Sequence, residues 1–179
     1  MKKRITTIAI LAASVVLATT GIATAWTTAP HARTSENIVQ VASEAPQFST
    51  LVSLIKKAGL EETLSGTEPF TVLAPTNAAF NRLPRKTLKA IAGNPTLLMK
   101  VLTYHVIPGT AMAADVVKLN GTRVTTVEGD KVSITVRNHK VFINNTSTVI
   151  TTDIEASNGV MHAISKVLVP KSVLNALSH

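Results

Sequence analysis

The chain has 179 residues, no cysteine, and 18 Lys and Arg against 10 Asp and Glu, which gives a formal net charge of +8. The absence of cysteine excludes disulfides and any catalytic or metal-binding thiolate. One Trp, one Tyr and four Phe provide few rings on which bases could stack, so we expect no nucleic-acid partner. A binding protein and an enzyme without thiol chemistry both remain open.

The first 25 residues have the pattern of a secretory signal peptide. A basic KKR at 2–4 precedes the apolar run at 5–18, and the small residues ATA follow at 23–25. A membrane span needs roughly 20 predominantly apolar residues, more than this run supplies. We expect residues 1–25 to be removed, with an uncleaved anchor as the alternative, so that only this segment meets a membrane. The mature chain is then secreted to a periplasm, the cell envelope or the medium, with a net charge of +5 because three of the 18 basic residues are lost.

The next part of the chain predicts a leader followed by helices. Residues 26–35 show no apolar periodicity, and we expect a flexible leader there. Ser35 is placed to cap a short helix that ends at Ser43. Apolar residues at 48–60 then recur at helical spacing, with Gly59 as a helix end.

A buried strand and two further helices are expected next. Residues 70–74 are apolar and β-branched and lie between two prolines, which favours a short buried strand. Thr76 is placed to cap the helix that follows. Another helix is predicted at 84–93, and a third begins with Asn94 as its cap and Pro95 at its first position.

The second half of the chain changes to a period of two, which is typical of half-buried strands. Gly129-Asp130 and Asn138-His139 are hairpin signals between these strands. The expected strands are 132–136, 141–143, 149–154 and 160–164. Helices gathered in one half and antiparallel strands in the other predict a single α+β domain.

Polar residues interrupt two apolar runs, FTVLAPTNAAF at 70–80 and SNGVMHAISKVLVP at 157–170. A buried hydroxyl, amide or imidazole without a partner costs about 1–3 kcal/mol. We therefore expect these residues to form a structural polar core, with direct ligand contact as the alternative. They are Thr76, Asn77, Asn158 and His162.

Tyr104 and His105 interrupt a third apolar segment. On a strand, neighbouring side chains point to opposite faces of the sheet. We therefore expect one of these two side chains to be more exposed than the other.

We find no catalytic or metal-binding pattern. The five histidines form neither an i, i+4 pair nor HExxH, and the chain lacks the GxSxG, GxxxxGK[ST] and GxGxxG motifs. We predict no enzymatic activity, no catalytic residues, no metal and no cofactor. A cryptic hydrolase would require an exposed Ser–His pair within hydrogen-bond reach.

Three ordered motifs resemble those of the fasciclin-like domain family, in the manner of a bacterial, secreted, single-domain member of the β-Ig-H3/fasciclin type. FTVLAPTNAAF is similar to the first signature, TYHVIPG at 103–109 to the Tyr-His motif, and NGVMHAISKVLVP to the second signature. Two departures are Met161, where Ile or Val is common, and Ser165, where Asp is frequent. The resemblance covers residues 36–171 and leaves 172–179 as a C-terminal tail.

The resemblance implies a helical layer packed on a small twisted antiparallel β-wedge, and a non-enzymatic role in cell adhesion or extracellular matrix contact. In animal members the Tyr-His motif and an Asp-Ile pair are associated with integrin binding. The matching positions are Tyr104, His105, Asp153 and Ile154. Because the signal and leader look bacterial, we expect a different partner here, namely a cell-surface or matrix protein or polysaccharide.

An alternative function is a secreted carrier that holds a small apolar ligand between the helices and the wedge, because an apolar pocket needs only a few polar groups. The sequence indicates no oligomeric state. Asn-x-Ser/Thr patterns occur at 120–122 and 144–147, but we expect no glycosylation in a bacterial product.

Overall fold

The structure, a computed structural model, describes residues 35–178. The predicted signal peptide and nearly all of the predicted leader lie outside the described residues. The helices of the described part are α1 (Ile38–Glu44), the 3-10 helix η1 (Pro46–Phe48), α2 (Ser49–Ala58), α3 (Glu61–Ser65), α4 (Asn77–Asn81), α5 (Arg85–Gly93), α6 (Pro95–Tyr104), α7 (Ala113–Lys118) and α8 (Lys171–Leu177). The strands are β1 (Phe70–Pro75), β2 (Val106–Pro108), β3 (Arg123–Thr125), β4 (Lys131–Arg137), β5 (Lys140–Ile143), β6 (Ser147–Ala156) and β7 (Gly159–Ile164).

Most helix ends follow the predicted local chemistry. Thr76 caps α4, and Asn94 caps α6 with Pro95 at the first helical position. Gly59 ends α2 in the left-handed conformation, at φ 66°. The prediction that Ser35 caps the first helix is wrong. Asn37 takes that role, because its side chain accepts from the N–H of Gln40 while Gln40 bonds back to the N–H of Asn37.

The strands form one seven-stranded arrangement in the order β2-β1-β7-β6-β5-β4-β3. All neighbouring pairs are antiparallel except β1 and β7, which are parallel. The predicted antiparallel β-wedge is present, and it includes this one parallel pair, which needs a long crossover connection. Residues 76–158, which contain α4 to α7 and the other strands, provide that crossover.

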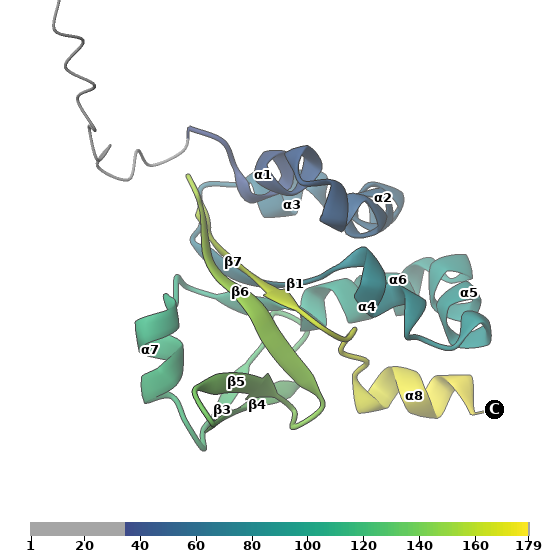
Figure 1. Cartoon of the computed structure of the whole chain (residues 1–179). Coiled ribbons are helices and arrows are strands. Elements are labelled where there is room, and N and C mark those ends of the chain that lie inside the picture. Colours follow the sequence, from purple (N-terminus) through teal and green to yellow (C-terminus); the bar gives the residue numbers. More distant parts are fainter. Residues whose placement is uncertain (1–34, 179) are drawn as a thin grey trace, which may run out of the picture. The chain divides into compact units, whose positions relative to one another are not determined.

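Strands β1 and β7 are buried on both faces and divide the interior into two cores. On one face, Val72 and Met161 pack against α1, α2, α5 and α6, and this cluster is called the helical-side core. On the other face, Leu73 and Ile164 pack against α7, β4 and β5. Figure 1 shows α1, α2 and α3 on one side of the β1, β7 and β6 strands and the β3–β5 hairpins on the other. Burial on both faces explains why the sequence of β1 is a continuous apolar run.

Residues 172–179 were expected to be a tail, but Lys171–Leu177 form helix α8. Val173 in this helix is fully buried and belongs to the helical-side core. The tail expectation failed because a single buried valine in a short segment gives no visible helical period. Within the described residues, no helix has both the length and the apolar character that crossing a membrane requires.

Candidate functional site

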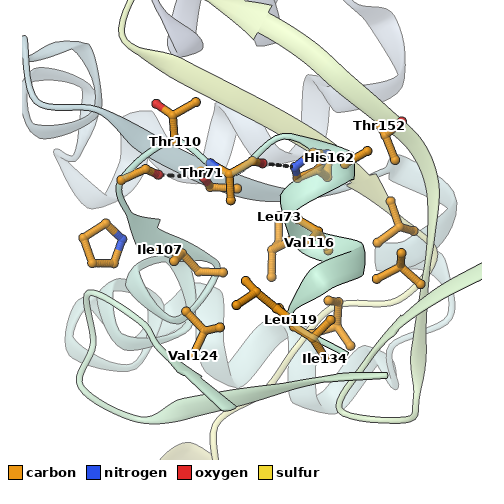
Figure 2. Close-up of a pocket in the computed structure, with 17 residues that line it drawn as sticks. Thr71, Leu73, Ile107, Thr110, Val116, Leu119, Val124, Ile134, Thr152 and His162 are labelled. Atoms are coloured by element: carbon orange, nitrogen blue, oxygen red, sulfur yellow. Dashed lines mark hydrogen bonds between the residues drawn. The ribbon is translucent and has the colours of Figure 1, made fainter. Parts of the chain in front are cut away.

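A cavity of about 180 Å³ lies on the face of β1 and β7 that is covered by α7 and the β3–β5 hairpins. Figure 2 shows threonine side chains and His162 at one end of the cavity and aliphatic side chains at the other. The aliphatic walls come from β1, β2, α7 and the β3–β5 hairpins. Within the described part of the chain, no Asp, Glu, Lys or Arg lines the cavity. Aliphatic residues that the site uses are Leu73, Ile107, Val116, Val124, Ile134 and Ile143.

Two polar side chains at the edge of the cavity fasten the loop that precedes α7. The Thr71 hydroxyl donates to the carbonyl of Gly109 at 2.6 Å and accepts from the N–H of Ala111 at 2.8 Å. His162 donates from Nε2 to the carbonyl of Ala111 at 2.8 Å (Figure 2). Loop 109–112 is therefore held by one side chain from each of the two central strands.

Asp153 extends this fastening to α7 itself. Its carboxylate accepts from the N–H of Ala113, the first residue of the helix, at 2.7 Å. The N–H of Asp153 in turn donates to Nδ1 of His162 at 3.2 Å. Asp153 stands at a bulge of β6 in the left-handed conformation, φ 55°, which Asp tolerates better than most residues. The neighbouring Ile154 is half-buried and packs against the helical-side core.

The Tyr104–His105 pair lies at the end of α6, with Tyr104 as its last residue and His105 as its C-cap. The prediction that one of the two side chains is more exposed is wrong, because they are 5% and 1% exposed. The pair does not alternate on a strand; it ends a helix that is packed into the core. Neither side chain is at the surface, so direct contact with a partner is unavailable to them in this structure.

His105 bridges two backbone groups. Nδ1 donates to the carbonyl of Val101 at 2.7 Å, and Nε2 accepts from the N–H of Leu168 at 3.0 Å. Burial lowers the pKa of His105 to about 4, although the bond to Val101 opposes this shift. The imidazole is therefore neutral near pH 7 and ties α6 to the segment that follows β7.

The Tyr104 hydroxyl is also held on both sides. It donates to the carbonyl of Lys131 at 3.3 Å and accepts from Nδ2 of Asn144 at 2.9 Å. Burial raises the pKa of the Tyr104 phenol. These bonds join α6 to the β3–β5 hairpins, away from the cluster of Asp153 and His162, so the structure separates the two halves of the predicted partner-binding set.

The predicted polar core residues of the first signature hold helix starts. The Thr76 hydroxyl accepts from the N–H of Ala79 at 3.4 Å. Asn77 reaches an earlier part of the chain, where its side chain accepts from the N–H of Thr50 at 3.0 Å and donates to the carbonyl of Pro46 at 2.9 Å. Asn77 thus supports the first turn of α2.

Asn158 joins three segments. Its side-chain oxygen accepts from the N–H of Ile38 at 2.9 Å, and its Nδ2 donates to the carbonyls of Leu64 and Gly66 at 2.7 and 2.8 Å. The side chain is buried. One amide therefore links the start of α1, the end of α3 and the β6–β7 turn.

Two residues of these networks were missed in the sequence. The sequence pattern assigns Thr71 only to an apolar strand, although a lone hydroxyl inside FTVLA indicates a buried polar group that needs a partner. Asn144 appeared only in a glycosylation pattern, yet it bonds Tyr104 and adopts φ 51° at the turn after β5. A positive φ is favourable for Asn, but no sequence pattern indicates which distant side chain it meets.

The polar groups of the site are arranged for support rather than for reaction. Among residues 35–178, no three His, Asp or Glu side chains group as metal ligands would, and each buried side-chain nitrogen or oxygen has a hydrogen-bond partner. Both ring nitrogens of His105 and of His162 are bonded to backbone groups. Neither imidazole therefore has a nitrogen available as a general base or a metal ligand.

The fold and site define a single α+β domain in which buried polar side chains cross-link backbone segments around an apolar cavity. The chain belongs to the fasciclin domain family, because the family model for the fasciclin domain matches residues 46–170.

Known relatives and a solved structure agree with this assignment. Protein sll1483 of Synechocystis sp. is 44% identical over 135 residues, which cover 74% of this chain and 73% of that protein. Transforming growth factor-beta-induced protein ig-h3 of Sus scrofa is 33% identical over 138 residues, covering 77% of this chain but only 20% of that protein. A fasciclin domain pair from the insect cell adhesion molecule Fasciclin I has the same fold, with a TM-score of 0.63 at 16% identity, over 77% of this chain and 52% of that chain.

Proposed function

We propose that the protein is a secreted, non-enzymatic interaction module that contacts a cell-surface or matrix protein or polysaccharide. Family membership supports this proposal, since the structural relative is a domain pair of a cell adhesion molecule. The observation that carries it is that the buried polar side chains of the described residues are all engaged in internal hydrogen bonds. Recognition is thereby left to the exterior of the domain.

We place the contact on the β6 bulge surface, defined as residues 150–153. Ile150 is 57% exposed there, and the pairing register of β6 shifts within this segment. Bulges re-aim side chains away from regular pairing. In this proposal Asp153 and Ile150 meet the partner, Ile154 supports the segment from beneath, and the buried Tyr104 and His105 maintain the scaffold.

Binding of the purified protein to the envelope and matrix fraction of its own host tests the proposal. Ile150→Glu places a charge in the contact and is expected to weaken binding at least about tenfold. Leu174→Glu, at a 47% exposed position of α8, is the matched control and leaves binding unchanged. Equal binding by both variants and the unmodified protein would refute the contact surface.

Asp153 offers a second test that separates charge from support. Asp153→Asn keeps an oxygen that can accept from Ala113 but removes the charge, whereas Asp153→Ala removes both. If the partner reads the charge, Asp153→Asn weakens binding while thermal stability stays near that of the unmodified protein. If only Asp153→Ala loses binding, Asp153 acts by holding Ala113 and not by contacting the partner with its charge.

The cavity favours a second candidate function, a carrier for a small apolar molecule. Its enclosed aliphatic walls between the central strands and the hairpins suit an apolar ligand. Native mass spectrometry of the protein purified from its own host tests this candidate. A retained small molecule supports a carrier, and a ligand-free mass in every preparation contradicts it.

A further inference from the structure

We propose that the cavity beneath α7 is a binding site for one compact, uncharged, apolar molecule, and that loop 109–112 together with α7 forms its cover. This inference rests on the carrier function and specifies where the ligand lies and what chemistry it has.

The size of the cavity limits the ligand. At about 180 Å³ it is slightly larger than an engineered apolar cavity of about 150 Å³ in another protein, which stays dry and binds benzene or xenon. Drug-sized ligands occupy pockets of roughly 300–1,000 Å³. The site therefore fits a single ring or a short branched hydrocarbon with the cover closed.

The chemistry of the walls excludes charged ligands. Of the residues that the structure describes, His162 is the one ionisable side chain that lines the cavity. His162 accepts at Nδ1 and donates at Nε2, so both of its ring nitrogens are already bonded to backbone groups. Thr71 uses its hydroxyl proton on Gly109. A polar group on a ligand would lose its water, while Thr71 and His162 already use their polar atoms on backbone groups and most of the wall is aliphatic, so an apolar molecule is favoured.

The cover is a short element whose beginning is held by three side chains. Thr71, His162 and Asp153 together bond the segment from Gly109 to Ala113. Beyond this segment, Val116 is 8% exposed and lines the cavity, while Val117 is 48% exposed and faces solvent. Opening the cover at this end requires breaking these hydrogen bonds and withdrawing the inner face of α7, while Gly121 after the helix can stay bonded to the carbonyl of Ile134 at 2.8 Å.

Benzene and xenon are the probes for the test. We expect benzene to raise the Tm of the full chain by a few degrees, because a ligand that binds only the native state stabilises it. We also expect benzene and xenon to shift the NMR signals of the Ile134 and Ile143 methyl groups, which line the cavity. Absence of both responses in the unmodified protein overturns the site without recourse to variants.

Filling variants locate the binding. Val116→Phe and Val124→Phe each place a ring in the cavity and are expected to weaken benzene binding more than tenfold. Val117→Phe and Val127→Phe, at exposed positions close by in the chain, are the matched controls and keep it. If a folded filling variant still binds benzene as the unmodified protein does, the proposed site is wrong. If one of the two filling variants does not fold, the other provides the test.

The cover is tested by the exchange kinetics of benzene. Asp153→Ala removes the acceptor for Ala113 and is expected to speed benzene exchange and hydrogen exchange of the Ala113 amide at least tenfold, whereas Asp153→Asn changes both less. Equal rates in all three proteins would overturn the role of the cover.

The outcomes for carrier and site are separable. If the protein from the host is free of ligand but still binds benzene in the cavity, the proposed binding site is supported and the carrier function is contradicted. If a host molecule remains bound in Val116→Phe and Val124→Phe, the carrier function is supported and the location of the ligand in this cavity is contradicted.

Discussion

Replacing Asn158 by alanine is the most direct test of whether the polar motif residues are internal cross-links. The side chain is 7% exposed and makes three hydrogen bonds to backbone groups of Ile38, Leu64 and Gly66. Alanine removes this partner from two buried groups, on Ile38 and Leu64, and from the part-buried carbonyl of Gly66, and each buried group left unpaired costs about 1–3 kcal/mol. Allowing for partial relaxation, we expect Asn158→Ala to lower the free energy of unfolding by about 3–5 kcal/mol.

A loss of this size is a large part of the roughly 5–15 kcal/mol that stabilises a typical domain. Urea denaturation measures it as a lower midpoint with an unchanged m value. Asn175→Ala, at an exposed position of α8, is the matched control and is expected to change stability by less than about 0.5 kcal/mol. Asn158→Asp retains an acceptor for Ile38 but turns a second oxygen toward two carbonyls, so we expect it to lose at least as much as Asn158→Ala. A folded Asn158→Ala protein that loses less than about 1 kcal/mol would refute the reasoning.

Three further changes probe the same framework. Gly159→Ala is expected to abolish folding or to lower the free energy of unfolding by several kcal/mol, because φ is 150° and a Cβ would overlap the backbone of Phe70. Thermal denaturation measures the loss. Gly93→Ala is the control, because a Cβ at Gly93 meets open space. For His105, the folded pKa of about 4 lies below the usual 6.5, so the unfolded chain binds more protons between these values. The His105 contribution to the free energy of unfolding is therefore complete above pH 6.5, and it falls by up to about 3 kcal/mol as the pH drops toward 4. Urea midpoints across this pH range and an NMR titration of the His105 ring measure this effect. A ring pKa near 6.5 would contradict the prediction. Tyr104→Phe removes a hydroxyl that donates one bond and accepts another, and we expect a loss of about 1–2 kcal/mol in urea; an unchanged midpoint would show that these bonds contribute nothing net.

The sequence predicts helix starts and ends correctly where these depend on residues that are close in the chain. Thr76 and Asn94 cap the helices that follow them, and Gly59 ends the helix before it. These assignments succeed because a cap bonds N–H groups two or three residues away. The expectation for Tyr104 and His105 failed because a helix end and a strand start read alike in a short apolar run.

The sequence indicates some members of the candidate site but neither Thr71 nor the geometry that joins them. Asp153 and His162 were both singled out, yet the bonds that join them to each other and to the loop before α7 were not. Their partner-binding and structural roles had been assigned separately, whereas the structure brings them into one network. The limits of the domain at 36–171 remain a prediction, although α8 extends the packed core beyond them.

The amino-acid sequence by itself determined the α+β class, the positions of most helices and strands, and the ordered motifs of the fasciclin domain family, since these depend on periodicity, caps and turns within a few residues. The tertiary structure alone decided that β1 and β7 run parallel, that Tyr104 and His105 are interior, and that a cavity remains beneath α7. The physical reason is distance along the chain. Asn158 and Leu64 are 94 residues apart, and Asp153 and Ala113 are 40 residues apart, and no local pattern encodes which distant backbone group a buried side chain will reach.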